Sequence, residues 1–432
     1  MCRPFFNDNM KKIIVIGGGA AGMMAAISAA EQGADVTIFE KNEKLGKKIF
    51  ITGKGRCNLA NECDRDTFFS NVVRNPKFLY KAYSDYSAND VLDFFRREGL
   101  EIKTERGNRV FPISDHSSDV IKTLERALKS RRVTVNLFSK VESLKVIDGE
   151  IKGISLENGK EVLADGVVIA TGGVSYPSTG STGEGLKFAS ECGHNIMNCH
   201  PALVPFETAE EYITSMQGLA LKNVELSIFE GKENGRLLYK EFGELLFTHF
   251  GISGPVVLSA ASVLAGMLPI SGNRKTSDPV LYAKIDLKPA LSNEKLDAKI
   301  LNEVSTSPKK SVSTMVGSYL PASMRPVFDN LLGFDTSKNL SDLSKNERKN
   351  IIKLLKAFPM TLTATRGYNE AIITSGGVSI KDINPSTMES KKIKGLYFAG
   401  EMIDVDAFTG GFNLQIAWST GHLAGKKAGG ME

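Results

Sequence analysis

The chain has 432 residues, of which 42% are hydrophobic and 24% are charged, and its formal net charge is +5. This composition excludes an intrinsically disordered chain and predicts two or three globular domains. The small, dispersed positive charge argues against a nucleic-acid partner, and five cysteines without a repeating frame fit a reducing, cytoplasmic compartment better than a disulfide scaffold.

The amino-terminal stretch raises the question of a leader or a membrane anchor. Residues 1–9, MCRPFFNDN, have no apolar core of the kind found in signal peptides, and we interpret them as a loose extension. Ile13 to Ala30 carries no charge and approaches the length of a spanning helix. Three consecutive glycines divide it into a β-branched run and an Ala/Met-rich run, so the pattern favours a strand followed by a helix, with no membrane association.

Residues 13–41, IIVIGGGAAGMMAAISAAEQGADVTIFEK, have the pattern of a β-α-β unit. The elements expected are a strand at 13–16, a helix at 20–32 that Gly33 ends, and a strand at 36–39 followed by Glu40. The glycines have the G-x-G-x-x-G spacing of dinucleotide-binding turns, and the acid lies about twenty residues beyond them.

Each residue type in this unit has a physical role. Gly17 permits a tight turn, Gly19 lets the backbone approach a pyrophosphate, and Gly22 allows the helix to pack closely on the strand. The helix start offers free N–H groups and a positive dipole end to phosphate oxygens, and Glu40 is suited to bind ribose hydroxyls. The cofactor-binding residues predicted here are Gly17, Gly19, Ala20, Ala21, Gly22, Glu40, Lys41 and Lys48.

Two later segments favour FAD over NAD as the bound dinucleotide. Residues 162–173 are a strand that ends in Thr171, Gly172 and Gly173, and residues 393–421 run from a strand to Gly400, an acidic loop, a glycine pair and a helix. Flavoproteins aim such a helix start at the flavin ring, where it stabilises negative charge. We expect Asp404 to contact the ribityl chain or phosphate, with Glu401 and Asp406 as less favoured choices, and a ring contact from Gly410, Gly411, Phe412, Asn413 and Leu414.

These motifs together resemble a known family. The segments GGGAAGMMAAISAA, VTIFEKNEKLGKKIFITGKGRCNLAN, VIATGG, TRGYNEAIITSGGV and GLYFAGEMIDVDAFTGGFNLQIAWSTG are similar to those of bacterial NAD(P)/FAD-dependent oxidoreductases. That family includes aminoacetone-oxidase-like and 3-dehydro-bile-acid Δ4,6-reductase-like flavoproteins and belongs to the glutathione-reductase-like two-dinucleotide-binding superfamily.

The resemblance implies an α/β fold: a discontinuous Rossmann-like FAD-binding domain with an inserted β-barrel-like domain and a helical subdomain. The sequence pattern agrees, because alternating strand-like runs follow residue 201 and helical runs fill 292–356. The domains expected are an FAD-binding domain at 10–200 and 376–432, a β-rich domain at 201–290 and 357–375, and a helical subdomain at 291–356.

The loop GKGRCN, residues 53–58, matches the family residue for residue. In related flavoproteins this loop runs beside the flavin, so the resemblance implies cofactor contacts from Gly53, Lys54, Gly55, Arg56, Cys57 and Asn58. A basic, solvated loop is the alternative. Cys57 and Cys63 invite comparison with redox pairs, but their spacing is longer than that of flavin disulfide reductases, and no compact ligand spacing indicates a metal site.

Four further positions are weaker candidates. The superfamily resemblance implies an adenine contact at Val141. The polar, glycine-rich residues 172–185 either wrap near the cofactor or form a surface loop. His249 is a candidate acid and Arg366 a candidate carboxylate-binding group, although a structural role is the more common one for each. Together with Cys57 they are the only catalytic candidates.

The sequence therefore predicts an FAD-dependent oxidoreductase in which hydride passes through flavin N5 between NAD(P)H and a small organic substrate. No second glycine fingerprint is present, so NAD(P)H would bind transiently at the flavin face. The substrate expected is a conjugated enone such as a 3-oxo-Δ4 steroid or bile acid. The alternatives are an aminoacetone-like amine oxidase that uses O2 and, in another class, a tRNA-linked flavoprotein; the oligomeric state stays open.

Overall fold

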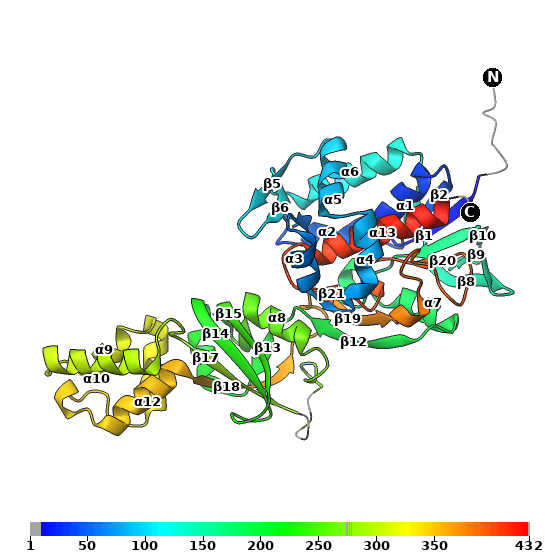
Figure 1. The fold of residues 1–432 in the computed structure, drawn as a ribbon. Helices are drawn as coiled ribbons and strands as arrows, with labels where there is room; N and C mark the ends of the chain where they lie inside the picture. Colours follow the sequence, from blue (N-terminus) through cyan, green and yellow to red (C-terminus); the bar gives the residue numbers. More distant parts are fainter. Residues whose placement is uncertain (1–9, 274, 276, 278, 431–432) are drawn as a thin grey trace. The chain divides into compact units, whose positions relative to one another are not determined.

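The computed structural model describes residues 10–273, 275, 277 and 279–430 (Figure 1). The proposed loose extension at residues 1–9 lies outside this range. The chain forms two compact units, one built from residues up to Ala202 and from Tyr368 onward, the other from Leu203 to Gly367. We call them the first unit and the second unit.

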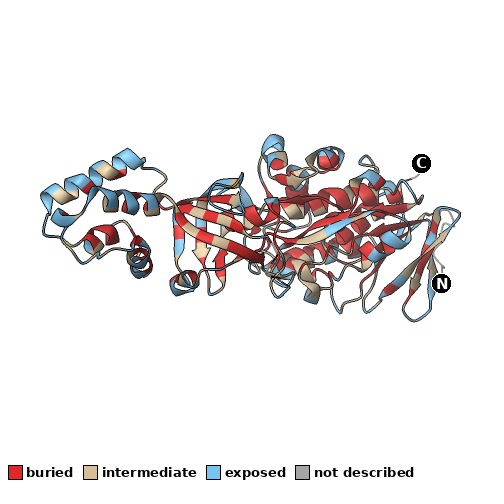
Figure 2. Ribbon diagram, turned by 90° about the horizontal axis from the view of Figure 1, so that it is seen from below, coloured by how far each residue is buried: buried red, intermediate tan, exposed pale blue. Residues whose placement is uncertain are grey.

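A five-stranded parallel sheet is the centre of the first unit. Its strands are β1 (Lys12–Ile16), β2 (Asp35–Phe39), β7 (Thr134–Asn136), β11 (Gly166–Ile169) and β20 (Leu396–Phe398), in the order β20-β11-β1-β2-β7. Apolar residues of β1 and β11 are buried on both faces, as their continuous β-branched runs predict (Figure 2). The sheet is the Rossmann-type α/β core that the sequence predicts.

Two helices from opposite ends of the chain pack together on this sheet. They are α1 (Ala20–Glu31) and α13 (Phe412–Gly429). A Cβ added to Gly425 would lie 2.0 Å from the carbonyl oxygen of Ala25, and Gly421 and Gly429 face Ala21 and Ala29 in the same way. The glycines thus let the two helix backbones touch. The uncharged run from Ile13 to Ala30 is therefore a strand and a helix, and no helix in the described residues has the length and apolar character needed to cross a membrane.

Smaller sheets and helices complete the first unit. Its other helices are α2 (Lys47–Ile51), α3 (Arg65–Ser70), α4 (Tyr80–Asp85), α5 (Ala88–Arg97), α6 (Ser117–Ser130) and α7 (Glu184–Glu191). Its other strands are β3 (Ala60–Asn61), β4 (Val72–Arg74), β5 (Ile102–Glu105), β6 (Arg109–Pro112), β8 (Val141–Ile147), β9 (Glu150–Leu156), β10 (Glu161–Leu163), β12 (Ile196–Ala202), β19 (Ile373–Val378) and β21 (Asp406–Ala407). Strand β12 pairs with β19, and β4 pairs with β21.

The second unit contains a closed six-stranded barrel and a group of helices, as expected for an inserted β-barrel and helical subdomain. The barrel strands are β13 (Phe206–Thr208), β16 (Gly251–Ser253), β15 (Leu237–Phe247), β14 (Ala220–Glu230), β17 (Leu281–Asp286) and β18 (Phe358–Thr365). The helices are α8 (Pro255–Val263), α9 (Asn293–Thr306), α10 (Val312–Gly317), α11 (Arg325–Leu332) and α12 (Lys345–Lys356). Ser344 and Glu347 form a capping box that fixes the start of α12.

The return of the chain to the first unit comes earlier than the sequence pattern suggests. The second unit ends at Gly367, whereas we expected the FAD-binding domain to resume at residue 376. Strand β19 explains the difference, because it pairs with β12 rather than with the barrel. An alternating strand pattern is compatible with either partner, so sequence alone does not choose between them.

Candidate functional site

A deep cleft opens at the carboxyl ends of the parallel strands of the first unit. It encloses about 1360 Å³, its open mouth included. In α/β sheets ligands bind at this edge, where the loops after the strands converge. The residues predicted to bind the cofactor that line the cleft are Gly17, Gly19, Ala20, Ala21, Glu40, Lys41, Lys48, Val141, Thr171, Gly172, Gly400, Glu401, Asn413 and Leu414.

The three glycines of the first turn differ in what surrounds them. Gly17 has φ +102°, and an added Cβ would lie 2.7 Å from the carbonyl oxygen of Ala170. A Cβ on Gly22 would lie 1.9 Å from the carbonyl oxygen of Gly17, which explains the close packing of α1 on the turn. At Gly19 nothing lies within 4 Å of the Cβ position. Since Gly19 lines the cleft, its open side is space that a ligand can fill.

Glu40 ties the glycine turn to the end of β2. Its carboxylate is 8% exposed and accepts hydrogen bonds from the backbone N–H of Gly18 at 2.7 Å and of Asn42 at 2.8 Å. The Asn42 side-chain amide donates a further bond at 2.7 Å. Two carboxylate oxygens offer about four acceptor sites, so capacity remains for a ribose hydroxyl.

A polar network crosses the cleft wall between α2 and the segment after β20. Lys48 Nζ lies 2.5 Å from Glu401 Oε2 and 2.6 Å from the hydroxyl of Ser175. The Ser175 hydroxyl and the backbone N–H of Thr374 both donate to Glu401 Oε1, at 2.7 and 2.8 Å. The acid of the late segment is therefore held in place by three separate parts of the chain.

Of the three acids that follow β20, the one that lines the cleft is not the one that the sequence analysis favoured. Glu401 lines the cleft, whereas Asp404, which we favoured, does not. Asp404 is buried and accepts a hydrogen bond from Asn75 Nδ2 at 3.0 Å, with Arg74 Nε 3.6 Å away. Asp406 is buried as well and also lies outside the lining. An acid-rich loop does not reveal which of its side chains face inward, because that depends on the turn geometry of the loop.

The GKGRCN loop does not line this cleft. The guanidinium of Arg56 donates hydrogen bonds to Glu105 and Asp115 and lies over the Phe111 ring. Its positive charge is therefore paired with two carboxylates of the protein. Burial raises the pKa of the Cys57 thiol to about 12, which leaves no reactive thiolate at neutral pH. Gly53, Lys54, Gly55 and Cys57 all have positive φ, and the buried Oδ1 of Asn58 has no hydrogen-bond partner among the described residues.

Other candidates lie behind the cleft wall or in the second unit. Gly22, Gly173, Gly410, Gly411 and Phe412 do not line the cleft, and Gly411 packs against the backbone of Ala60. In the second unit His249 is exposed beside Phe250, and Arg366 Nη1 forms an ion pair with Glu207 Oε1 at 2.7 Å.

The remaining cysteine and histidine candidates show no shared site. Cys57, Cys63, Cys192 and Cys199 are free thiols. His194 bonds the carbonyl of Ala189 and the hydroxyl of Ser390. Within the described chain no group of three or more His, Cys, Asp or Glu side chains is placed to hold a metal ion.

Sequence reasoning missed several residues that line the cleft. Asn42, Ile373 and Thr374 all do so. The sequence left two interpretations open for residues 172–185, a segment that wraps near the cofactor and a surface loop. Gly172, Thr179, Gly180 and Ser181 line the cleft, which agrees with the first. Ile373 and Thr374 belong to β19, whose pairing with β12 carried no signal in the sequence.

The residues present fit a dinucleotide. The helix start at Ala20 and the open side of Gly19 suit a pyrophosphate, and Glu40 suits the adenosine ribose. Thr171 lines the cleft, but its buried Oγ1 lies against Gly185 and has no hydrogen-bond partner among the described residues. The start of α13, with Asn413 and Leu414, faces the other end of the cleft.

Comparisons with known proteins agree with this geometry. The family model described as HI0933-like protein Rossmann domain matches residues 11–427. The chain is 30% identical to a 3-dehydro-bile acid delta(4,6)-reductase of Clostridium scindens, over 97% of this chain and 99% of that protein. It is 31% identical to a ribosomal RNA dihydrouridine synthase of Escherichia coli, over 94% and 95%, and 29% identical to one of Haemophilus influenzae, over 95% and 96%.

A solved structure supports the fold. A 3-ketosteroid-delta4-(5alpha)-dehydrogenase from Rhodococcus jostii matches with a TM-score of 0.51 at 16% identity, covering 98% of each chain. These matches confirm the family that the motifs predict and its class, the FAD-dependent oxidoreductases. The chain belongs to the HI0933-like family of FAD-binding Rossmann-fold proteins.

Proposed function

We propose that the protein reduces a carbon–carbon double bond conjugated to a carbonyl group, with FAD in the cleft of the first unit and NAD(P)H as the electron donor. The observation that carries this proposal is the shared chemistry of its relatives. A delta(4,6)-reductase of a 3-dehydro bile acid and a dihydrouridine synthase both act on a double bond conjugated with a carbonyl. Both match this chain over nearly its whole length, at about equal identity.

Bound FAD would supply hydride at N5, which the side chains of this protein cannot do. The chain's own residues hold and orient the cofactor. The start of α1 and Gly19 would bind the pyrophosphate, Glu40 the ribose, and Lys48 and Glu401 would fix the wall near the ribityl chain. Asn413 and Leu414 at the start of α13 would place the positive end of that helix beside the ring.

Anaerobic reduction of the purified holoenzyme tests this function. Bleaching of the flavin absorbance by NADH or NADPH, followed by its return on addition of a 3-oxo-Δ4 steroid, is the expected result. If neither NADH nor NADPH reduces the flavin, NAD(P)H is not the electron donor. If no conjugated carbonyl compound reoxidises the reduced flavin, the proposed reaction is wrong. Under air, peroxide release driven by an amine would instead favour the oxidase alternative.

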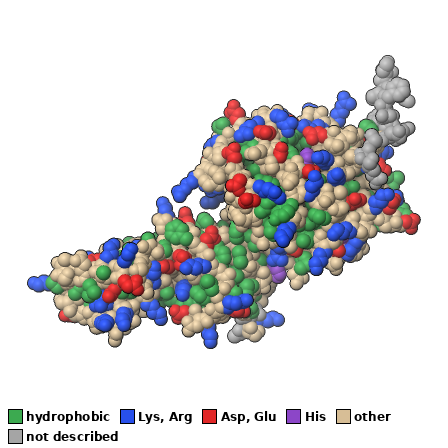
Figure 3. Space-filling model, viewed as in Figure 1, with side chains coloured by type: hydrophobic (Ala, Val, Ile, Leu, Met, Phe, Trp, Pro, Cys, Tyr) green, Lys and Arg blue, Asp and Glu red, His purple; other side chains and the backbone are tan. Residues whose placement is uncertain are grey.

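Uridine in ribosomal RNA is a second candidate substrate, since two relatives carry the name ribosomal RNA dihydrouridine synthase. Our expectation that nucleic acid plays no part therefore lacks support from the relatives. Positive and negative side chains are interspersed on the face shown in Figure 3, without one dominant basic area. The helical region 291–356 nevertheless has eleven Lys and Arg residues and seven Asp and Glu residues. Its net charge is therefore +4, compared with +5 for the whole chain.

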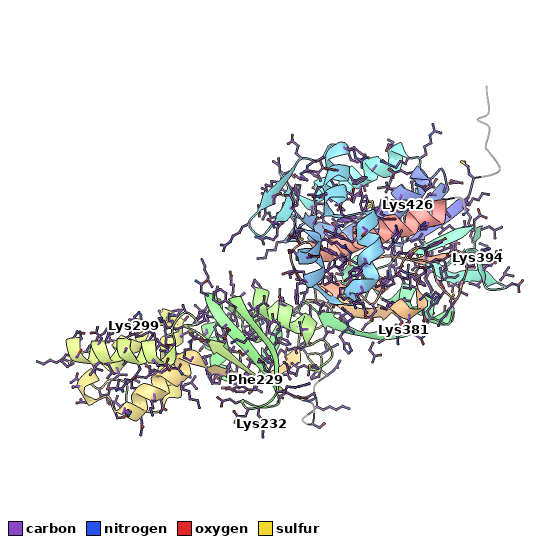
Figure 4. The ribbon with its side chains drawn as sticks, viewed as in Figure 1. Phe229, Lys232, Lys299, Lys381, Lys394 and Lys426 are labelled. Atoms are coloured by element: carbon purple, nitrogen blue, oxygen red, sulfur yellow. The ribbon has the colours of Figure 1, made fainter. Side chains whose placement is uncertain are left out.

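Exposed lysines of this helical region provide the test for an RNA substrate. Lys299 projects from α9 (Figure 4), and Lys345, Lys349 and Lys353 are exposed on α12. If RNA is the substrate, replacing these four by Glu should weaken binding of ribosomal RNA and reduce its salt dependence. Replacement by Glu of four exposed lysines of the first unit, Lys122, Lys152, Lys160 and Lys187, is the matched control. Equal RNA binding by both variants would exclude this region as the RNA contact.

A further inference from the structure

A group of buried oxygen atoms lies directly behind the cleft wall. Ser375 is 0% exposed, Asp404 5% and Asp406 1%. Four of their side-chain atoms have no hydrogen-bond partner of normal geometry in the described structure: the hydroxyl of Ser375, Oδ1 of Asp404 and both carboxyl oxygens of Asp406. Buried polar atoms are nearly always satisfied in proteins, so such a group indicates a functional requirement.

Within the described residues no cation forms an ion pair with Asp406. Arg74 lies opposite Asp406 in the β4–β21 ladder, but its Nε approaches Asp404, which also receives the bond from Asn75. Glu401, the third acid of this segment, forms an ion pair with Lys48. The three acids of this segment therefore have two neighbouring cations, Arg74 and Lys48, between them.

The remaining titratable groups nearby come from β12, which pairs with the strand of Ser375. Burial lowers the pKa of His200, and the charge of Arg74 lowers it further, so this histidine is less readily protonated than a free one. Burial raises the pKa of the Cys199 thiol, and the charges of Asp404 and Glu401 add to the rise. Burial also raises the pKa of Asp406 to about 6; the Ser375 hydroxyl and the charge of Arg74 oppose this rise, and the charges of Asp404 and Glu401 add to it.

Asp406 is connected to the cleft on both sides. Val405 and Thr374, the neighbours of Asp406 and Ser375 in the chain, both line the cleft. Ala407, the next residue, exchanges two hydrogen bonds with the side chain of Asn413, at 2.9 and 2.7 Å, and Asn413 lines the cleft as well. Asp406 and Ser375 therefore lie next to residues that line the cleft or that bond one of its lining side chains.

We infer that Asp406 is a proton-holding positioning residue of this site, and that binding of the anionic dinucleotide is coupled to protonation of its carboxyl group. The inference rests on the proposed cofactor. A carboxylate behind the wall makes the electrostatic potential in the cleft more negative and so disfavours an anionic ligand there, whereas the neutral acid does not. Because such coupling is reciprocal, the cofactor binds more tightly when Asp406 is protonated, and its binding draws a proton from solution.

The test measures the affinity of the apoprotein for FAD by fluorescence quenching at pH 5.5 and pH 8. We expect binding to be at least about fivefold weaker at pH 8, within the usual range for coupled sites. Asp406→Asn should bind with one affinity at both pH values. Asp93→Asn, which changes an acid with a 66% exposed side chain on α5, should retain the wild-type dependence.

The possible failures are distinguishable. If FAD does not bind at any pH, the proposed function is wrong. If FAD binds the wild-type protein equally at both pH values, or if Asp406→Asn keeps the wild-type dependence, the coupling is wrong. Should Asp406→Asn fail to fold, calorimetry of FAD binding to the wild-type protein at pH 7, in two buffers of different ionisation enthalpy, measures proton uptake directly. Zero uptake would overturn the inference.

Discussion

Lys48 and Glu401 are 353 residues apart in the sequence, yet their side chains meet at 2.5 Å in the wall of the cleft. The ion pair joins α2, near the beginning of the chain, to the segment that follows β20, near its end. A double-mutant cycle with Lys48→Met and Glu401→Gln should therefore show a coupling of about 1–2 kcal/mol in urea unfolding, as charge-assisted hydrogen bonds of partly buried groups do. Additive effects of the two substitutions would mean that the pair contributes nothing to stability.

The glycines of the first turn should respond differently to alanine. Gly22→Ala places a methyl group against the carbonyl of Gly17, so it should lower the free energy of unfolding by about 1–3 kcal/mol. Gly19→Ala meets no atom of the protein and should leave the melting temperature unchanged while weakening FAD binding tenfold or more. Thermal melts of the apoproteins and FAD titrations measure the two effects. Loss of stability in Gly19→Ala would contradict the assignment of its open side to the cofactor.

The contact of α1 with α13 depends on the absence of side chains. Gly→Ala normally stabilises a helix by up to about 1 kcal/mol, but at Gly425 the new methyl would overlap the carbonyl of Ala25. We expect Gly425→Ala to destabilise the protein by about 1–3 kcal/mol. Lys427→Ala, on the exposed face of the same helix, should change stability by less than about 0.5 kcal/mol. Chemical denaturation compares the two variants directly.

Asp406 should make stability depend on pH. Its pKa is raised from 3.8 to about 6 in the folded protein, so the native state binds the proton more tightly than the unfolded state does. The stabilisation that this tighter proton binding provides is fully present below about pH 4 and is lost as the pH rises through about 6. The stability of Asp406→Asn relative to wild type should therefore rise by about 2 kcal/mol between pH 4 and pH 7, most of the full effect of about 3 kcal/mol at about 1.4 kcal/mol per unit of pKa. A pH-independent difference between the two proteins would show that Asp406 ionises normally.

Cys57 should be unreactive in the folded protein. Burial raises the pKa of its thiol to about 12, whereas Cys63, Cys192 and Cys199 are only partly buried. Iodoacetamide at pH 8 should label these three within the time that leaves Cys57 unmodified, as peptide mass spectrometry would show. Labelling after unfolding in urea provides the control for detection of Cys57. Rapid alkylation of native Cys57 would restore the case for a redox role.

The sequence predicted the parts of the fold that depend on local pattern. The strand, turn, helix and acid of residues 13–40 have glycine spacings and apolar runs typical of one local structure, and barrel strand β17 alternates between buried and half-buried residues. The pairing of β19 with β12 could not be predicted, because it is a contact between segments about 170 residues apart with no distinguishing pattern. The cleft residues Ile373 and Thr374 were missed for that reason.

The orientation of loop side chains was the second limit. Motif matching correctly indicated an acidic segment after β20, but it favoured Asp404 over Glu401. The choice depends on the short helical turn at Gly400–Met402, which directs Glu401 toward Lys48 and Ser175. Similarly, the basic loop at residues 53–58 has its arginine satisfied by Glu105 and Asp115, two acids from outside the loop. Such partners become visible only in three dimensions.

The packing of α13 on α1 has a consequence for how the chain is made. During synthesis β1 and α1 leave the ribosome before the second unit, but α13, the helix that covers them, is made only after it. The barrel and its helices, which are continuous in sequence, can fold while the ribosome is still translating, whereas the first unit must wait until α13 has been made. A nascent chain stalled before residue 412 should therefore protect the barrel from protease and leave the amino-terminal segment susceptible.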